Sequence, residues 1–285
     1  MVASPAVPPD RDVVAIAARA YERDRYLAAL LGPVGVRADL IALAAFAGEI
    51  ARIPGFVTEP ALGEIRLQWW RDALDRLAAG EPATGNPIAD AVGTAVRRHR
   101  LPVELLHGLI DAHSARLGDA PFADLAALSA NLAATDGAQF RLAAQVLGAG
   151  DAPPELLHRG GQAYGLARLL LELPATLSEQ RCLLPVDRLA AHSLAPETLH
   201  LPEARASLHE IEMELAATAA AADEQVRAGW RTVGPALRAA LLPVALVRPY
   251  LRTCQGGGGV AFESRDIVPL TRVWRLWRAY RLLWP

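Results

Sequence analysis

The sequence contains no lysine, so all 29 of its basic residues are arginines. Against 31 acidic residues they leave a formal net charge of −2. A nearly neutral chain has no overall field to attract nucleic acid, and we expect no nucleic-acid partner. Arginine forks readily onto carboxylates and phosphates, but a bias that runs through the whole chain does not single out any one arginine for such a task.

Cysteine and long apolar runs are also scarce. Cys182 and Cys254 form no CxxC pair and have no histidine close by in the sequence, which argues against a metal site built on them and favours a reducing compartment. No apolar run reaches the roughly 18 residues that a bilayer-spanning helix needs. The first residues lack the basic and apolar segments of a secretory signal. We therefore expect a cytoplasmic protein, with peripheral attachment to the inner membrane as an open alternative.

Segments rich in the β-branched residues that strands favour are few, whereas alanine and leucine, both strong helix formers, are abundant. The composition predicts an all-α protein with one domain over residues 10–285, preceded by a disordered, proline-rich tail at residues 1–9. Pro54 and Pro174 are expected to end the helices before them. The expected helices cover residues 10–31, 37–53, 58–79 or 60–79, 87–99, 102–117, 122–147, 154–173, 202–228, 234–252 and 269–283.

Five segments resemble those of the squalene/phytoene synthase family, the helical head-to-head prenyltransferases, and they occur in the family's order. The resemblance implies an isoprenoid-synthase-like helical fold around a central cavity. The segments are DRYLAALLGPVGVRADLIALAAFAGEIARI (24–53), RLQWWRDAL (66–74), LSANLAATDGAQFRLAAQVLG (128–148), GQAYGLARLLLELP (161–174) and RCLLP (181–185).

The resemblance also implies a site for prenyl diphosphates, in which two DxxxD motifs on facing helices hold Mg²⁺. Carboxylates four residues apart point to the same side of a helix, and Mg²⁺ takes oxygen ligands. This sequence departs from both motifs. At the first, the aspartate positions fall on Ala51 or Arg52 and near Gly55 or Phe56, and only Glu49 is acidic. At the second, Glu172 remains but Thr176 stands where its partner would be.

One carboxylate per helix is a poor donor set for a magnesium cluster, so we expect no resident metal, and Mg²⁺ only if the chain is an active transferase. Glu49 with Arg52, and Glu172 with Arg168, have the spacing of structural ion pairs. The positions that the resemblance implies for cavity or substrate contacts are Tyr26, Arg37, Trp70, Arg71, Gln139, Arg168 and Arg181. For Trp70 and Arg71, core packing and an ion pair are the alternative.

Within the family, the sequence is most similar to a subset that has lost these carboxylates: the assembly factors of NADH:ubiquinone oxidoreductase (complex I) and their bacterial relatives. The similarity lies in AF-x-x-E-[IL]-A at 45–51, R-x-Q-[WF]-W at 66–70 and A-V-x-R-H at 95–99. It implies a non-catalytic protein that acts by binding, with a membrane respiratory complex or its assembly intermediates as partner. Two alternatives stay open: an active prenyl-diphosphate transferase with atypical metal ligands, and a carrier of an isoprenoid or lipid ligand.

The last segment, TRVWRLWRAYRLLWP, carries two stripes at helical spacing. Trp274, Trp277, Tyr280 and Trp284 form the aromatic stripe, and Arg272, Arg275, Arg278 and Arg281 form the basic one. This composition is typical of a helix that lies at a membrane surface. We predict membrane contact through Trp274, Trp277, Arg278 and Arg281. The alternative is that the helix packs on the domain and closes the bundle.

Overall fold

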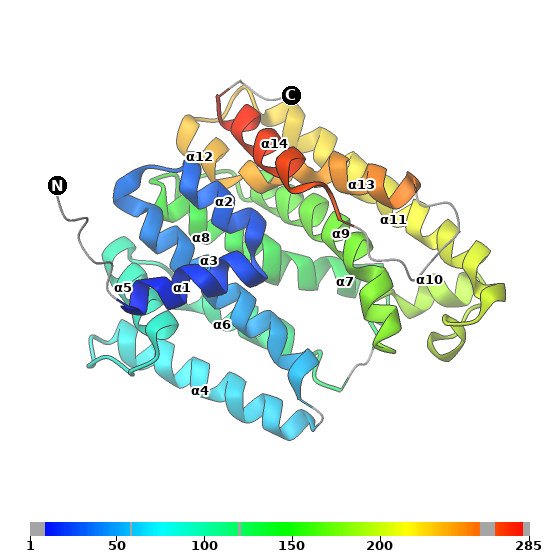
Figure 1. Cartoon of the computed structure of the whole chain (residues 1–285), viewed down its shortest axis with the longest axis horizontal. Helices are drawn as coiled ribbons and strands as arrows, with labels where there is room; N and C mark the ends of the chain where they lie inside the picture. The colour runs from blue at the N-terminus through cyan, green and yellow to red at the C-terminus, as the bar shows by residue number, and fades with distance from the viewer. Residues whose placement is uncertain (1–8, 58, 119–120, 257–265, 282–285) are drawn as a thin grey trace, which may run out of the picture.

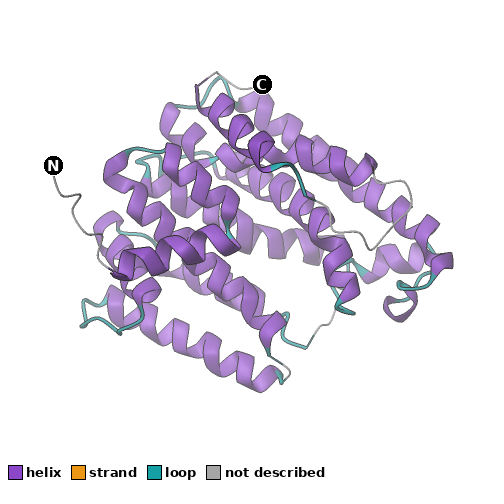
Figure 2. Cartoon of the chain, viewed as in Figure 1, coloured by secondary structure: helices purple, strands orange, loops and turns teal. Residues whose placement is uncertain are grey.

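The computed structural model describes residues 9–57, 59–118, 121–256 and 266–281, and every regular element in these ranges is helical (Figure 2). The all-α prediction is confirmed. Residues 1–8 of the expected tail lie outside the described residues, whereas Pro9 is the first residue of α1. None of the described helices is both long and apolar enough to span a bilayer.

Fourteen α-helices are described, joined in places by shorter helical turns (Figure 1). A π-helical turn, η1, spans Ala133–Gly137, and three 3₁₀ turns span Pro196–Thr198 (η2), Pro202–Ala204 (η3) and Leu242–Leu246 (η4). The α-helices are α1 (Pro9–Tyr21), α2 (Arg23–Leu31), α3 (Val34–Phe56), α4 (Pro60–Ala78), α5 (Pro87–His99), α6 (Val103–Ser114), α7 (Leu125–Leu132), α8 (Ala138–Val146), α9 (Pro154–Ser178), α10 (Val186–Ala191), α11 (Arg205–Gly229), α12 (Pro235–Ala240), α13 (Val247–Gly256) and α14 (Pro269–Arg281).

Two hydrophobic clusters form the core. One is built around α3, with Phe46 and Ile50 fully buried among side chains of α1, α4, α5 and α6. The other is built around α9, with Tyr164 and Leu170 buried where α9 packs against α11 and α13, and α14 adds Leu276 and Ala279 to the same cluster. Both α3 and α9 also contact α8, which therefore links the two clusters.

Two prolines expected to end helices lie inside them instead. α3 continues through Pro54 to Phe56, and α9 continues through Pro174 to Ser178. A proline inside a helix removes one backbone hydrogen bond. Burial compensates for this loss in α9, because Leu173, Pro174 and Leu177 all pack into the core. Tertiary packing therefore overrides the local signal, and the prediction that these prolines end the helices was wrong.

Three of the expected continuous helices are interrupted, one of them over 234–252, where the 3₁₀ turn η4 separates α12 from α13. The helix expected over 10–31 breaks at Glu22, between α1 and α2. Close packing surrounds the break, because a Cβ on Gly48 of α3 would come within 2.5 Å of the Cβ of Tyr21. The helix expected over 122–147 begins only at Leu125 and contains the π turn η1. The break at Glu22 and the π turn η1 direct the charged side chains of Glu22 and Asp136 into the interior.

Candidate functional site

Two polar cavities lie side by side next to α9. The larger has a volume of about 350 Å³ and is bordered by α1, α2, α9, α13 and α14. The smaller has a volume of about 190 Å³ and is bordered by α2, α3, α6, α7, η1 and α9. Glu22, Arg168 and Glu172 line both cavities, so these three side chains form the partition between them.

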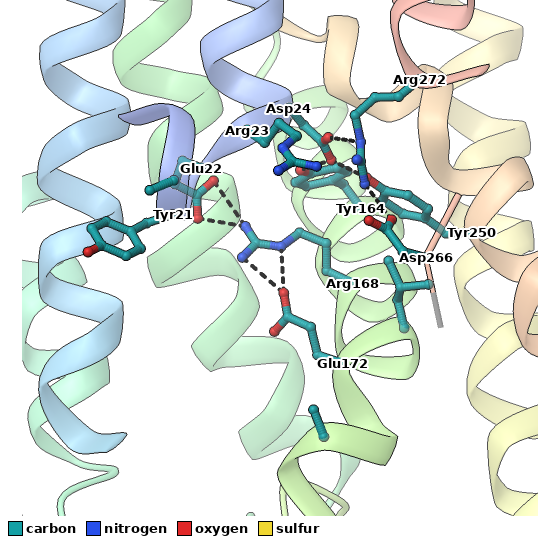
Figure 3. Close-up of a pocket in the computed structure, with 13 residues that line it drawn as sticks. Tyr21, Glu22, Arg23, Asp24, Tyr164, Arg168, Glu172, Tyr250, Asp266 and Arg272 are labelled. Carbon is teal, nitrogen blue, oxygen red and sulfur yellow. Dashed lines mark hydrogen bonds and ion pairs between the residues drawn. The ribbon is translucent and has the colours of Figure 1, made fainter. Parts of the chain in front are cut away.

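An ion-pair cluster fills this partition, and its members are Glu22, Arg25, Asp136, Arg168 and Glu172. Arg168 Nη1 lies 2.8 Å from Glu22 Oε1, and its Nη2 lies 3.3 Å from Glu172 Oε1 (Figure 3). Arg25 reaches Asp136 at 2.6 Å and Glu22 at 3.2 Å. The cluster holds three carboxylates and two guanidinium groups, so most of its charge is neutralised internally.

Burial and pairing act in opposite directions on these groups. Burial by itself lowers the pKa of Arg168, but Glu22 and Glu172 raise the pKa well above its ordinary value, so the guanidinium stays charged. Burial raises the pKa of Glu22, while Arg168 and Arg25 lower it in part. Glu22, Arg25, Asp136 and Arg168 thus form a largely buried network in which each charge depends on its partners, and Glu172, whose side chain is about half exposed, is its outer member. Removing one partner leaves another charge uncompensated.

Two glycines of α9 bring Asp136 into the cluster. A Cβ on Gly161 would lie 2.6 Å from the backbone nitrogen of Gly137, and a Cβ on Gly165 would lie 2.9 Å from Oδ2 of Asp136. Only glycine permits this approach of α9 to η1. In the π turn η1 each backbone hydrogen bond spans one residue more than in an α-helix. Asp136 lies within this turn and accepts a hydrogen bond from Arg25.

A second network, centred on the buried Asp24, closes the larger cavity. Tyr164 donates its hydroxyl proton to Asp24 at 2.7 Å, Tyr250 also donates to Asp24, and Arg272 Nε lies 2.7 Å from Asp24 Oδ1. Burial and the Asp24 charge raise the pKa of both tyrosines, which therefore remain neutral donors. Arg272 also binds Asp266 at 2.6 Å, so the start of α14 is held onto α2 and α13 (Figure 3).

The two helices expected to carry the acidic motifs, α3 and α9, both contribute to the wall of the smaller cavity. On α3 the residues that line the smaller cavity are Ala47 and Ala51, four residues apart. On α9 both Glu172 and Thr176 line it. Of the positions expected for the first motif, Ala51 lines this cavity, whereas Arg52, Gly55 and Phe56 do not. Among the three expected motif positions on the cavity wall, Ala51, Glu172 and Thr176, only Glu172 carries a carboxylate.

Glu49 and Arg52 of the first motif do not line either cavity. They form an ion pair of 3.1 Å, and the Arg52 guanidinium stacks at 3.7 Å over the ring of Tyr21. Glu172, the remaining motif carboxylate, is paired with Arg168. Mg²⁺ needs several free oxygen ligands, and no group of three potential metal ligands occurs among the described side chains. The residues present therefore do not fit the magnesium cluster of a prenyltransferase.

The seven expected cavity positions divide into two groups. Gln139, Arg168 and Arg181 line the smaller cavity. Tyr26, Arg37, Trp70 and Arg71 line neither cavity. Trp70 packs edge-on against Phe46 in the core, and Arg71 pairs with Glu64 and Asp111 on the surface, as the alternative interpretation had it. Arg37 donates to the carbonyl of Gly32.

Sequence reasoning missed four of the central side chains: Glu22, Arg25, Asp136 and His113. The first two belong to the run YERDR at 21–25, in which four consecutive charges interrupt an otherwise apolar segment. Such a run is a usable signal, because charges within a buried segment must find partners. Asp136 follows Thr135, and His113 lies between Asp111 and Ser114. Short polar groups of this kind also occur on exposed helix faces, so they do not mark a buried residue.

The two stripes expected on the last helix have different environments. Trp274, Trp277 and Tyr280 are each nearly half exposed, and Arg278 and Arg281 are exposed. Trp284 lies outside the described residues. Arg272 is buried against Asp24, so it belongs to the packed face with Leu276 and Ala279 rather than to an exposed basic stripe. The helix therefore closes the bundle with one face and exposes aromatic rings on the other.

Comparison with known proteins agrees with this fold. A family model described as squalene/phytoene synthase matches residues 18–275. Assembly factor 6 of NADH dehydrogenase (ubiquinone) complex I from Bos taurus is 26% identical over 266 residues, covering 91% of this chain and 80% of that protein. The Homo sapiens protein of the same name is 24% identical over 238 residues, covering 83% and 71%.

Solved structures show the same architecture. The squalene synthase HpnC from Alicyclobacillus acidocaldarius superimposes with a TM-score of 0.74 at 18% identity, over 87% of this chain and 95% of that one. A dehydrosqualene synthase in complex with a ligand gives a TM-score of 0.77 at 13% identity, over 95% of each chain. At these identities the likeness establishes the fold alone.

Proposed function

Because the chain belongs to the squalene/phytoene synthase family, we propose that it uses the family's frame for binding instead of catalysis and takes part in assembling a membrane respiratory complex of the NADH dehydrogenase type. The relatives from Bos taurus and Homo sapiens are named as assembly factors of complex I. Those relatives match most of this chain, which supports a shared role for the whole domain.

The observation that carries the proposal is the composition of the cavity wall. Ala47 and Ala51 occupy the cavity-facing positions of α3, and the carboxylates nearby are bound to Arg25 and Arg168. A prenyl-diphosphate transferase must stabilise a leaving diphosphate, and metal-bound carboxylates supply that stabilisation. Two of the positively charged groups in this cavity, Arg25 and Arg168, are already paired with protein carboxylates. The wall therefore favours a structural network over a reaction site.

The two other functions that the sequence leaves open receive less support. An active transferase would need metal ligands that α3 does not present to the cavity. A carrier for a long isoprenoid or lipid would need an apolar chamber, but charged residues partition the interior. The larger cavity, at about 350 Å³, is at the lower end of the range of roughly 300–1,000 Å³ of typical ligand pockets, and the smaller, at about 190 Å³, falls below it.

The first prediction concerns cells that lack this chain. We expect their membranes to contain much less assembled NADH dehydrogenase complex, measured by native gel electrophoresis and by NADH:quinone oxidoreductase activity, because an assembly step has been lost. Succinate dehydrogenase in the same membranes serves as the internal control and should be unchanged. The full-length chain supplied from a plasmid should restore the complex.

A single substitution separates the assembly role from catalysis. Glu172→Gln removes the one carboxylate left at the motif positions, and its side chain is about half exposed, so the fold should tolerate the change. The variant should restore the complex as well as the unchanged chain does, since binding needs no metal ligand there. If Glu172→Gln fails to restore the complex while remaining folded, and the purified chain converts a prenyl diphosphate with Mg²⁺ into a condensed hydrocarbon, the proposal is wrong.

A further inference from the structure

The outer face of α14 carries exposed apolar side chains opposite its buried face. The buried positions are Arg272, Leu276 and Ala279. The exposed ones are Leu270, Val273, Trp274, Trp277 and Tyr280, each between 46% and 75% exposed. In Figure 1, α14 lies on the outside of the bundle. A continuous apolar stripe left uncovered along a whole helix is uncommon on a soluble surface and marks an interaction site.

Arginines from three helices gather beside this stripe. We call Arg227 of α11, Arg248 and Arg252 of α13, and Arg275 and Arg278 of α14 the arginine cluster. Arg275 and Arg278 lie over the ring of Trp274 at 5.5 and 5.4 Å, which joins the cluster to the aromatic face. Because the five residues come from distant parts of the chain, the sequence alone does not show that they meet.

The cluster has a large excess of positive charge. The buried Asp223 accepts Arg227 at 2.6 Å and Arg248 at 3.0 Å. Within the described ranges, no carboxylate lies within ion-pair distance of Arg252, Arg275 or Arg278. Burial lowers the pKa of Arg275, and Arg252, Arg278 and Arg227 lower it further, as expected where guanidinium groups crowd together. Among the described residues, the charges of Arg252, Arg275 and Arg278 therefore repel one another, and a bound anion would relieve this repulsion.

We propose that the aromatic face of α14 and the adjoining arginine cluster bind the surface of a bilayer that contains anionic lipid. Tryptophan and tyrosine prefer the headgroup level of a bilayer, where one end of the ring is apolar and the other is wet. Arginines beside them reach lipid phosphates. The apolar stripe matches the apolar lipid chains, and the arginine cluster beside it matches the negatively charged headgroups. The inference rests on this surface alone and does not depend on the assembly role.

Vesicle flotation with the full-length protein tests the proposal. Vesicles of phosphatidylcholine alone are compared with vesicles that also contain phosphatidylglycerol, at low and at high salt. We expect binding to the mixed vesicles only, and weaker binding at high salt because exposed charges are screened. An excess of inorganic phosphate at constant ionic strength should not release the protein, since a single anion cannot replace a bilayer.

Matched charge variants locate the surface. Arg252→Gln combined with Arg275→Gln and Arg278→Gln should weaken binding roughly 100-fold, at about 1 kcal/mol per arginine near the surface. Because Arg275 is half-buried, the double variant Arg252→Gln with Arg278→Gln is a second measurement, with a loss of roughly 30-fold. The control, Arg66→Gln with Arg76→Gln and Arg205→Gln, removes the same charge from exposed positions elsewhere and should bind like the unchanged chain. Arg272 is left intact because it holds the buried Asp24.

Three outcomes would overturn the proposal: no vesicle binding at low salt, equal losses in the cluster and control variants, or unchanged binding in the folded double variant. A further measurement addresses a competing occupant of the face. If the full chain is dimeric in size-exclusion chromatography and Trp277→Ser makes it monomeric, a second copy of the chain covers the aromatic face, and the lipid proposal is wrong.

Discussion

His113 is a buried histidine whose protonation opposes folding. Its ring lines the smaller cavity, and burial, reinforced by Arg116 and Arg168, lowers its pKa from the ordinary value of 6.5 to about 3. In the unfolded chain the ring takes up a proton below pH 6.5, whereas in the folded protein it stays neutral down to about pH 3. Protons therefore bind preferentially to the unfolded state between these values.

We accordingly expect the free energy of unfolding to fall as the pH drops from about 6.5 towards 3, with His113 contributing up to about 1.4 kcal/mol per pH unit. Urea titrations at a series of pH values measure this slope. His113→Gln should flatten it, and His209→Gln, at a residue that is 53% exposed, should leave it as it is. Equal slopes for the unchanged chain and His113→Gln would show that the ring is protonated in the folded state.

At the scale of the elements, the contact of α9 with η1 makes the strongest demand on particular residues. Gly161→Ala would place a methyl group 2.6–2.7 Å from backbone atoms of Gly137, which cannot move aside as a side chain can. We expect a loss of about 1–3 kcal/mol or more in thermal or urea unfolding. Gly108 of α6 offers the matched control, because a Cβ there meets no atom within 4 Å. Gly108→Ala should stabilise the helix by about 0.5–1 kcal/mol.

Helix boundaries show why some elements were predictable and others were not. The helix expected over 87–99 agrees with α5, whose start is marked by Asn86 capping the amides of Ile88 and Ala89. Such a start is encoded in a few neighbouring residues. The break at Glu22 and the π turn at Ala133–Gly137 are set by packing against α3 and α9 instead. Local sequence does not record a partner that lies more than 20 residues away.

The residues of the candidate site also divide into those that the sequence predicts and those that depend on distant partners. Glu172, Thr176, Arg168 and Gln139 were found because they sit at fixed places in recognisable family segments, and all four line the smaller cavity. Glu172 was also predicted as a partner of Arg168, and the ion pair forms. The other two partners, Glu22 and Asp136, were not predicted, because they are 146 and 32 positions away in the chain. The loss of the acidic motifs was visible in the sequence, whereas the ion-pair cluster that occupies their surroundings required the structure.

Considered as a whole, the molecule keeps the two-helix frame of α3 and α9 while changing the side chains that face the cavity between them. This separation is possible because Ala51 and Thr176 lie outside the buried core, so the frame does not depend on which side chains occupy these two positions. The family resemblance therefore predicts the fold well and the chemistry poorly. Binding of Mg²⁺ and a diphosphate is a property of the whole domain. It distinguishes a domain that keeps the fold alone from one that also keeps the chemistry.

We expect the melting temperature of the purified chain to stay the same when Mg²⁺ and inorganic diphosphate are added together. A ligand that bound only the folded state, at 100 times its Kd, would add about 2.7 kcal/mol, which corresponds to a rise of several degrees for a protein of this size. Ala51→Asp combined with Thr176→Asp places carboxylates back on the cavity-facing sides of α3 and α9. This variant should gain a rise that depends on Mg²⁺, because the helices already hold these positions opposite each other. A rise in the unchanged chain that disappears in Glu172→Gln would show instead that one carboxylate is enough to hold the metal, and the non-catalytic function would have to be abandoned.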